Sequence, residues 1–205
     1  MNSKMSLKET LLTLVMAVCC CISIYLFFVI EPPSKLYYAD IEIKDYGTIT
    51  VLLDGQAAPE TVTNFVSLAQ DGFYDGLTFH RIINGYMMQG GDPNGNGTGG
   101  SGTKIYGEFQ ENGFKNPLSH VRGTISMARS QNSNSASSQF FIMQADRPDA
   151  LDGKYAAFGH VVSGMEVVDQ VCADARPTDN NGTIPKAQQP VITSITIRDY
   201  DGAYD

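Results

Sequence analysis

The chain has 205 residues, of which 42% are hydrophobic, so it can form one domain of ordinary size but not a second large one. Its formal net charge is -8, and its 14 Lys and Arg residues form no run. Phosphate binding requires a concentrated basic surface, and we therefore expect no nucleic-acid partner. Helical periodicity is scarce, whereas Gly is frequent and short β-branched runs recur, which favours a mainly β fold.

Cysteine and histidine usage argues against a metal site. Cys19 to Cys21 fall inside the N-terminal apolar stretch, and Cys172 is alone in the remainder, so no disulfide can form within the domain. No Cys-x-x-Cys or His-x-x-x-His pair occurs, and His80, His120 and His160 are far apart in sequence. We therefore expect no metal and no cofactor.

An apolar segment, residues 11–30, has the length of about 20 residues that a helix needs to cross a bilayer core. A cleaved signal peptide would have a shorter apolar region that ends in small residues, whereas this run continues through Tyr25 to Ile30. We therefore expect a transmembrane anchor, with a signal segment as the alternative. A lipoprotein signal at Cys19 is less favoured because Val18 precedes it. A buried helix of the domain is less favoured because of the length of the run.

The charges beside this segment predict its orientation. Lys4 and Lys8 precede it, so residues 1–10 are expected to form a cytoplasmic tail. Residues 31–36 are expected to form a short linker, and residues 37–205 a domain on the extracytoplasmic side. The expected location is the membrane, on a bacterial cell surface.

The domain is predicted to open with two strands and a helix. Residues 38–43 and 48–53 have strand character, and Gly72 ends a helix over residues 59–71. The apolar residues of that helix recur at i, i+3, i+4 and i+7, which predicts one buried face: Val62, Phe65, Val66 and Ala69.

Residues 79–92 place a cation among apolar residues. The Asn84-Gly85 pair favours the positive φ angles of a two-residue hairpin turn between two strands. Strand alternation puts Phe79, Arg81 and Ile83 on one face. An arginine beside large apolar side chains therefore needs an explanation.

Two explanations of Arg81 stay open from this segment alone. In the first, the arginine has only a structural role: its stem extends to solvent, or it forms a buried ion pair. In the second, it is a fixed cation at the edge of an apolar pocket. In the second case Tyr86, Met87 and Gln89 accompany it.

The glycine-rich residues 92–102 contain Gly95, Gly97 and Gly100 in a GxGxxG arrangement. A phosphate-binding loop must open a helix, and residues 103–109 have no helical continuation, so we reject a nucleotide site. These glycines are expected to let an exposed loop turn tightly.

The second half of the chain alternates strands and loops. The predicted elements are a strand over 123–128, a Ser- and Asn-rich loop over 129–137, a strand over 138–143, a turn over 151–155 feeding a strand, a short helix over 165–171, a polar surface loop over 174–189 and a closing strand over 190–197.

The blocks Phe79-His-Arg-Ile-Ile83 and Met87-Met-Gln-Gly-Gly-Asp92 together resemble the signature of the cyclophilins, the cyclophilin-type peptidyl-prolyl isomerases. Ser126-Met-Ala128, Ser138-Gln-Phe-Phe-Ile142 and Leu151-Asp-Gly-Lys154 resemble later blocks of the family in the same order. The resemblance covers about residues 37–199. It implies a closed eight-stranded antiparallel barrel with two covering helices, here preceded by one transmembrane helix.

The resemblance also implies an activity and a site. The activity is peptidyl-prolyl cis-trans isomerisation of proline-containing polypeptides, with Arg81 as the catalytic residue, and we expect a monomer. Gly97 to Gly100 would border the site. The implied substrate-binding residues are Phe79, Tyr86, Met87, Gln89, Ala128, Arg129, Gln139, Phe141, Leu151 and Tyr155.

Such an enzyme needs no nucleophile, because it has only to favour the twisted amide over the planar forms. A guanidinium can donate a hydrogen bond to the prolyl nitrogen only while the amide is twisted, which is the role expected of Arg81. An apolar cup of Tyr86, Met87, Phe141 and Leu151 would hold the proline ring. Gln89 and Gln139 would bind the substrate backbone on the rotating side.

The sequence departs from the family pattern at three positions. Ala150 stands where many cyclophilins have Trp, which opens one wall and should weaken binding of bulky macrocyclic inhibitors. Tyr155 replaces a common His, and its phenol can still donate a hydrogen bond. Arg129 replaces a frequent Asn, which adds a second cation and favours acidic residues near the substrate proline.

Two functions follow from this comparison. The first is an isomerase that assists the folding of exported or secreted chains. The alternative is a chaperone or adaptor that binds proline-containing segments with little catalysis, although simple binding would not need Arg81. A protease or esterase is disfavoured, because no Gly-x-Ser-x-Gly elbow is present and nothing in the sequence orients a His against a Ser.

Overall fold

The structure is a computed structural model that describes residues 35–203 of the chain. The predicted cytoplasmic tail (1–10), the predicted membrane segment (11–30) and all but the end of the predicted linker (31–36) lie outside the described residues. Among residues 35–203, no helix has both the length and the apolar character that a bilayer crossing requires.

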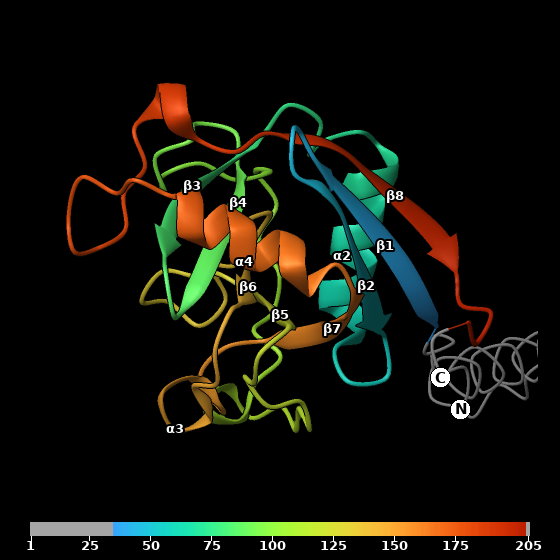
Figure 1. Ribbon diagram of the computed structural model, residues 1–205. Helices are drawn as coiled ribbons and strands as arrows, with labels where there is room; N and C mark the ends of the chain where they lie inside the picture. The colour runs from blue at the N-terminus through green and yellow to red at the C-terminus, as the bar shows by residue number, and fades with distance from the viewer. Residues whose placement is uncertain (1–34, 204–205) are drawn as a thin grey trace, which may run out of the picture. The chain divides into compact units, whose positions relative to one another are not determined.

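Within residues 35–203, eight strands form a single sheet (Figure 1). Their order is β3-β4-β6-β5-β7-β2-β1-β8, and every paired ladder is antiparallel. The strands are β1 (Leu36–Ile43), β2 (Gly47–Asp54), β3 (Thr78–Ile83), β4 (Met87–Asp92), β5 (Thr124–Met127), β6 (Phe140–Met143), β7 (Ala157–Ser163) and β8 (Ile192–Asp199). The predicted mainly β fold with eight antiparallel strands is confirmed.

The two end strands of this order, β3 and β8, share no ladder. A single bridge between Thr78 and Val191 joins their neighbouring ends. Two backbone hydrogen bonds flank it, from Phe79 N to Pro190 O at 2.9 Å and from Ile192 N to Leu77 O at 2.8 Å. The sheet is therefore a half-barrel whose ends meet at one point, which is less complete than the predicted closed barrel.

Two helices cover the sheet, as predicted. Helix α2 (Pro59–Gln70) packs against β2 and β8, and α4 (Met165–Asp174) packs against β2 and β4. In Figure 1 they lie on different sides of the strands. The buried faces consist of Thr61, Val62, Phe65, Val66 and Ala69 in α2, and Val167, Val168, Val171 and Cys172 in α4. A four-residue helix, α3 (Pro148–Leu151), and two 3-10 turns, η1 (Gln110–Asn112) and η2 (Lys186–Gln188), complete the described elements.

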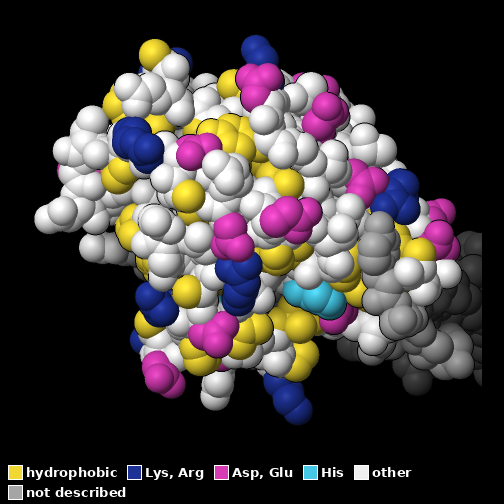
Figure 2. Space-filling model, viewed as in Figure 1, with side chains coloured by type: hydrophobic (Ala, Val, Ile, Leu, Met, Phe, Trp, Pro, Cys, Tyr) yellow, Lys and Arg dark blue, Asp and Glu magenta, His cyan; other side chains and the backbone are white. Residues whose placement is uncertain are grey.

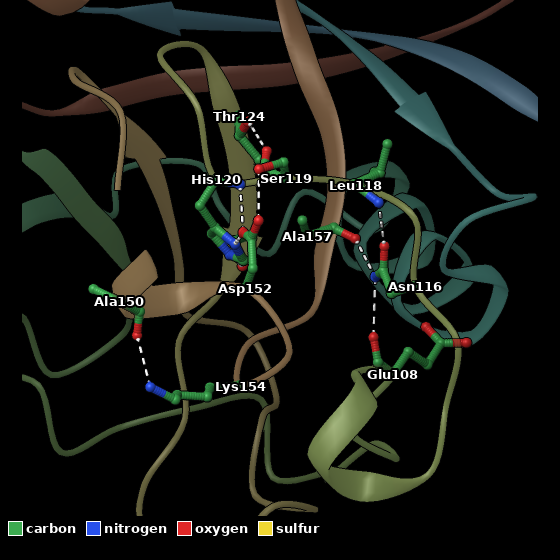
Figure 3. Close-up of polar contacts among 11 residues, drawn as sticks. Glu108, Asn116, Leu118, Ser119, His120, Thr124, Ala150, Asp152, Lys154 and Ala157 are labelled. Atoms are coloured by element: carbon green, nitrogen blue, oxygen red, sulfur yellow. Dashed lines mark hydrogen bonds and ion pairs between the residues drawn. The ribbon is translucent and has the colours of Figure 1, made fainter. Parts of the chain in front are cut away.

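A distant carboxylate caps the start of α2. Glu108 is buried, and its two oxygens accept hydrogen bonds from the backbone N–H groups of Glu60 at 2.9 Å and Thr61 at 2.8 Å. A negative charge at this end satisfies the unpaired amides and complements the helix dipole. Figure 3 shows Asn116 beside it, whose side chain donates to the carbonyls of Glu108 and Ala157.

The buried apolar residues of the described part of the chain form two separate clusters. The larger one fills the space between the sheet and the helices, and Phe65 at its centre contacts the rings of Tyr74, Phe140 and Phe158. The smaller one lies at β4, β6 and the end of α3. On the face shown in Figure 2, Lys and Arg side chains are separated and interspersed with Asp and Glu.

Candidate active site

The smaller cluster is an apolar cup built from four parts of the chain. Its buried members are Met87, Phe141, Met143 and Leu151, and Ile83, Tyr86, Ala128 and Tyr155 pack against them. Strand register brings the first three together, because Met87 pairs with Met143 and Gln89 pairs with Phe141 across β4 and β6. The structure thus brings together the four residues predicted to form the cup and adds Met143 and Ile83, which the sequence did not single out.

Arg81 stands at the edge of this cup. Its Nη1 lies 4.0 Å from the Met87 sulfur and 3.2 Å from Gln89 Oε1, and its Nε donates to the Asn181 carbonyl at 2.7 Å. No ion pair involves Arg81 among residues 35–203, and its Nη2 has no protein acceptor there. Of the two explanations of this arginine, the structural ion pair is therefore excluded for the described part of the chain.

A relay of amide groups extends from Arg81. Gln89 Nε2 donates to Gln139 Oε1 at 2.9 Å, and Gln139 Nε2 donates to the Gly99 carbonyl at 2.8 Å. Each amide therefore has a fixed orientation, with Gln89 Oε1 turned towards the guanidinium. Ala128 joins the same region, since its backbone N–H donates to the Gln139 carbonyl at 2.9 Å.

Phe79 does not belong to the cup, which corrects the predicted substrate-binding role. Its side chain is fully buried in the larger cluster, and its ring centroid lies 5.9 Å from that of Phe140. The cause is a β-bulge: Phe79 pairs with Gly90 and Arg81 pairs with Gln89, so β3 has one extra residue between them. A bulge interrupts the side-chain alternation, and Phe79 and Arg81 do not share a face as predicted.

Arg129 lies between the cup and a neighbouring cavity. Its guanidinium stacks on two rings, with the Cζ atom 4.8 Å from the Tyr155 centroid and 4.9 Å from the Phe109 centroid. Its Nε donates to the Lys154 carbonyl at 2.8 Å. The predicted second cation is thus held in a fixed position against one wall of the cup.

The cavity has a volume of about 460 Å³ and lies beyond Gln89 and Gln139. The described residues of its lining carry two cations and several hydroxyl groups but no carboxylate. The lining residues are Gln89, Gly97, Thr98, Gly99, Gly100, Gly102, Lys104, Ala128, Arg129, Ser130, Ser135, Ser137 and Gln139. The segment from Gly97 to Gly100, predicted to border the site, forms one side of it.

Asp92 holds this glycine-rich loop in place through hydrogen bonds to its backbone. It is buried, and its carboxylate accepts hydrogen bonds from the backbone N–H groups of Asn94, Asn96 and Gly97 at 2.6 to 3.0 Å. Burial alone would raise the pKa of Asp92, but these three bonds outweigh burial and hold the pKa below its usual value. The loop amides are therefore already occupied by an anion of the protein, consistent with the rejected nucleotide site.

His120 and Ser126 are buried behind the cup and form a Ser-His-Asp arrangement with the partly exposed Asp152, contrary to the expectation that nothing orients a His against a Ser. His120 Nδ1 lies 2.7 Å from Asp152 Oδ1 (Figure 3). His120 Nε2 lies 2.9 Å from Ser126 Oγ. His120 and Ser126 are 1% and 0% exposed, so no substrate can reach the hydroxyl. The His120 ring instead stacks on Phe141, with centroids 6.0 Å apart, and meets the edge of Tyr155.

This histidine supports the cup rather than reacting. Burial lowers the pKa of His120, although the hydrogen bond to Asp152 opposes that shift. A neutral imidazole therefore backs the Phe141 ring at neutral pH. Sequence analysis could not find it, because His120, Ser126 and Asp152 belong to no common motif.

Comparison with known proteins agrees with this geometry. The family model described as cyclophilin type peptidyl-prolyl cis-trans isomerase matches residues 38–198. A peptidyl-prolyl cis-trans isomerase of Synechococcus elongatus is 51% identical over 113 residues, which is 55% of this chain and 72% of the relative. One from Helicobacter pylori is 43% identical over 143 residues, which is 69% of this chain and 83% of the relative.

A solved structure is also similar. The cyclophilin-type peptidyl-prolyl cis-trans isomerase of Cryptosporidium parvum, crystallised in the presence of the dipeptide Ala-Pro, superposes with a TM-score of 0.69 at 30% identity. The match covers 80% of this chain and 99% of that one. With a family model over most of the chain, close relatives and a shared fold, this protein belongs to the cyclophilins and is a cyclophilin-type peptidyl-prolyl cis-trans isomerase.

Proposed function

We propose that Arg81 accelerates rotation about an X-Pro bond by stabilising the twisted amide. The proposal rests on a guanidinium that two acceptors fix at the edge of the cup, and that has neither a carboxylate partner nor an acceptor for Nη2 among residues 35–203. The planar amide offers no lone pair on nitrogen, and its rotation barrier is about 18 to 20 kcal/mol. A donor that binds the nitrogen only in the twisted form lowers this barrier, because it stabilises the transition state alone.

The proline ring would be held while the acyl side rotates. Met87, Phe141 and Leu151 offer an apolar floor and wall that suit a saturated ring. The amide groups of Gln89 and Gln139 lie beside them, where they can bind the backbone of the rotating side. Holding one side and turning the other needs no proton transfer and no covalent intermediate.

Binding of an out-of-plane mimic tests this proposal. We expect the protein to bind a proline peptidomimetic whose X-Pro linkage is held twisted about 100-fold more tightly than the matched planar peptide. The Arg81→Ala variant should bind both with similar affinity, because the cup is intact and only the selective donor is gone. If Arg81→Ala keeps the full preference for the twisted compound, another group stabilises it and the assignment of Arg81 is wrong.

We further propose that the enzyme is membrane-anchored and acts on exported or secreted chains outside the cytoplasm. The support is the uncharged segment 11–30, which follows Lys4 and Lys8. Isomerisation of X-Pro bonds is slow enough to limit folding, so an isomerase at the exit side would assist newly exported chains.

Fractionation and protease accessibility test the location. The full chain should sediment with membranes, resist extraction by high salt and be cleaved by protease added outside intact cells or spheroplasts. A variant in which Leu14 and Leu26 are replaced by Arg should lose membrane association, since a charge inside the segment opposes insertion. Recovery of the unaltered chain in the soluble cytoplasmic fraction would contradict the proposal.

A further inference from the structure

We infer that the segment Thr178–Ile184 positions Arg81, and that Gly182 is the residue that allows this segment to lie against β3. This inference rests on the proposed role of Arg81. The sequence predicts only a polar surface loop over residues 174–189, yet part of this loop lies along β3 and makes direct contact with the guanidinium.

The contact to the guanidinium comes from the main chain. Arg81 Nε donates to the carbonyl oxygen of Asn181 at 2.7 Å, the shorter of its two contacts to oxygen acceptors. Because the acceptor belongs to the backbone, the conformation of the segment sets its position, and the Asn181 side chain does not. The segment therefore has to lie in one place for this bond to form.

Two backbone hydrogen bonds, which together make one antiparallel bridge, hold the segment against β3. Ile82 N donates to the Gly182 carbonyl at 2.8 Å, and Ile184 N donates to the His80 carbonyl at 3.0 Å. Thr183 forms an isolated antiparallel bridge with Arg81 itself. The segment thus runs beside β3 like a short extra strand at the position of the catalytic residue.

The segment is also closed on itself. Asp179 Oδ1 accepts from Thr183 N at 3.0 Å, and the Asp179 carbonyl accepts from Gly182 N at 3.2 Å. Thr178 N donates to the Thr183 carbonyl at 2.9 Å. Hydrogen bonds from the Thr183 backbone and hydroxyl hold the pKa of Asp179 below its usual value, so this carboxylate is ionised at neutral pH. The turn therefore has hydrogen bonds of its own besides its contacts with β3.

Only glycine fits at position 182. Gly182 is buried and has φ +88°, a backbone conformation that residues with a side chain rarely adopt. A Cβ placed there would lie 2.5 Å from Ile83 Cγ1 and 2.6 Å from the Ile82 carbonyl. Since a carbonyl of the strand cannot move aside, alanine would push the segment away from β3, and the Asn181 carbonyl would move with it.

Two acceptors fix the plane of the guanidinium. Asn181 O holds Nε and Gln89 Oε1 holds Nη1, which leaves Nη2 as the donor available to a substrate. A planar group bound at two points keeps one orientation, whereas one bond leaves it free to swing. Misplacement of a catalytic group by about 1 Å can cost a factor of about 100 in rate.

The test compares two glycine substitutions in the full chain. Gly182→Ala should lower kcat about 10- to 100-fold with little change in KM, because the donor is misplaced while Met87, Phe141 and Leu151 of the cup are not among the atoms nearest the added methyl group. Gly76→Ala is the matched control: Gly76 has φ +77° and a Cβ there meets nothing within 4 Å, so it adds backbone strain without displacing β3. Gly76→Ala should therefore keep the kcat of the unaltered protein.

A spectroscopic signature separates positioning from general damage. In the unaltered protein the Arg81 Nε–H should give a slowly exchanging NMR resonance, and Gly182→Ala should make it exchange about tenfold faster or more. Amide resonances of the larger core should stay in place. If Gly182→Ala does not fold, Asp179→Ala is the second test. Asp179 is exposed, and this substitution removes only the hydrogen bond from Thr183 N to its carboxylate, which closes the turn. It should lower kcat and speed the exchange of the Arg81 Nε–H, as expected for Gly182→Ala.

The Arg81→Ala variant distinguishes the two claims. If it retains the full rate, the proposed role of Arg81 fails. If it is inactive while the folded Gly182→Ala variant, or Asp179→Ala in its place, keeps both kcat and the slow Nε–H signal, the role of Arg81 stands and the positioning inference is overturned.

Discussion

Arg81 and Gln89 lie opposite each other on β3 and β4, and Nη1 of Arg81 donates a hydrogen bond of 3.2 Å to Oε1 of Gln89. This geometry requires the oxygen of the Gln89 amide to face the guanidinium. The remaining NH2 group donates to Gln139, which fixes that choice. The cation is thus oriented by a neutral group and keeps its full charge for a substrate.

Replacing that neutral group by a carboxylate should weaken catalysis. Gln89→Glu has nearly the same shape, but its charge would pair with Arg81 and reduce the pull of the guanidinium on the prolyl nitrogen. We expect kcat to fall about tenfold, with a Tm near that of the unaltered protein. Gln139→Glu, one amide further from Arg81, should reduce kcat by less. Equal losses in the two variants, or none in Gln89→Glu, would contradict this relay.

Stability should fall as the pH decreases through the histidine range. Burial lowers the pKa of both His120 and His80, although Asp152 and Asp92 oppose these shifts. In the unfolded chain these histidines bind protons near the ordinary pKa of 6.5, whereas in the native state they bind protons only at lower pH. The free energy of unfolding therefore decreases below about pH 6.5.

Urea unfolding between about pH 7 and about pH 5 measures this loss above the range in which carboxylates titrate. His120→Asn should make the free energy of unfolding less dependent on pH, and the double variant with His80→Gln should flatten it further. A free energy of unfolding that is constant or rises as the pH falls would show that these imidazoles are not held neutral by burial.

The apolar cup was predictable because short motifs carry it. Met87 and Gln89 are fixed relative to each other by strand alternation, and so are Gln139 and Phe141. The register between β4 and β6, which brings Phe141 opposite Gln89, comes from the paired backbone and has no local signal. The resemblance to the cyclophilins, and not a local pattern, was what placed Phe141 in the same site as Gln89.

The errors come from backbone irregularities and from long-range contacts. The bulge in β3 turns Phe79 into the core, and no residue type at positions 78–81 announces an extra residue. The hairpin turn also differs: Gly85 alone has a positive φ, +76°, and Ile83 pairs with Met87, so the loop has three residues and not two. Alternation alone detects neither feature.

The loop over residues 174–189 was interpreted from its composition, which is polar and contains two prolines. Its contacts with β3 join residues about 100 positions apart, such as Arg81 and Asn181. The composition of a loop indicates that it is exposed, but it does not indicate which distant strand the loop contacts. The sequence shows only that position 182 is a glycine, and its burial and positive φ, which mark the close backbone approach, come from the structure.

Arg129 should give the enzyme a preference for acidic residues before the substrate proline. Arg129 lines the cavity beyond the cup together with Lys104, and no carboxylate from the described part of the chain lines that cavity. We expect kcat/KM for a peptide with Glu on the N-terminal side of proline to exceed that for the Lys peptide by a few-fold, about what a partly exposed charge pair contributes.

The ratio should fall towards one in Arg129→Asn, and also in about 1 M salt, where the Debye length is about 3 Å. Salt is the informative control, because it screens the charge without removing the stacking of Arg129 on Tyr155. A ratio that is insensitive to both changes would exclude an electrostatic origin.

Ala150 should limit the binding of bulky macrocyclic inhibitors. It is exposed on α3, next to Leu151 of the cup, where many cyclophilins have Trp. Ala150→Trp should add an apolar wall and tighten inhibitor binding about tenfold, measured by competition with a labelled peptide. Asp149→Trp, at the exposed neighbouring position, should leave the affinity unchanged. The prediction fails if both variants behave alike.

The most direct test of the central claim is the rate of cis-trans exchange of a short X-Pro peptide, measured by NMR exchange spectroscopy with the full chain and with Arg81→Ala. We predict that the unaltered protein accelerates exchange strongly and that Arg81→Ala loses about 100- to 1,000-fold of kcat while it still binds the peptide and keeps its Tm. Equal exchange rates with the two proteins would contradict the account, because the cup alone would then suffice for catalysis.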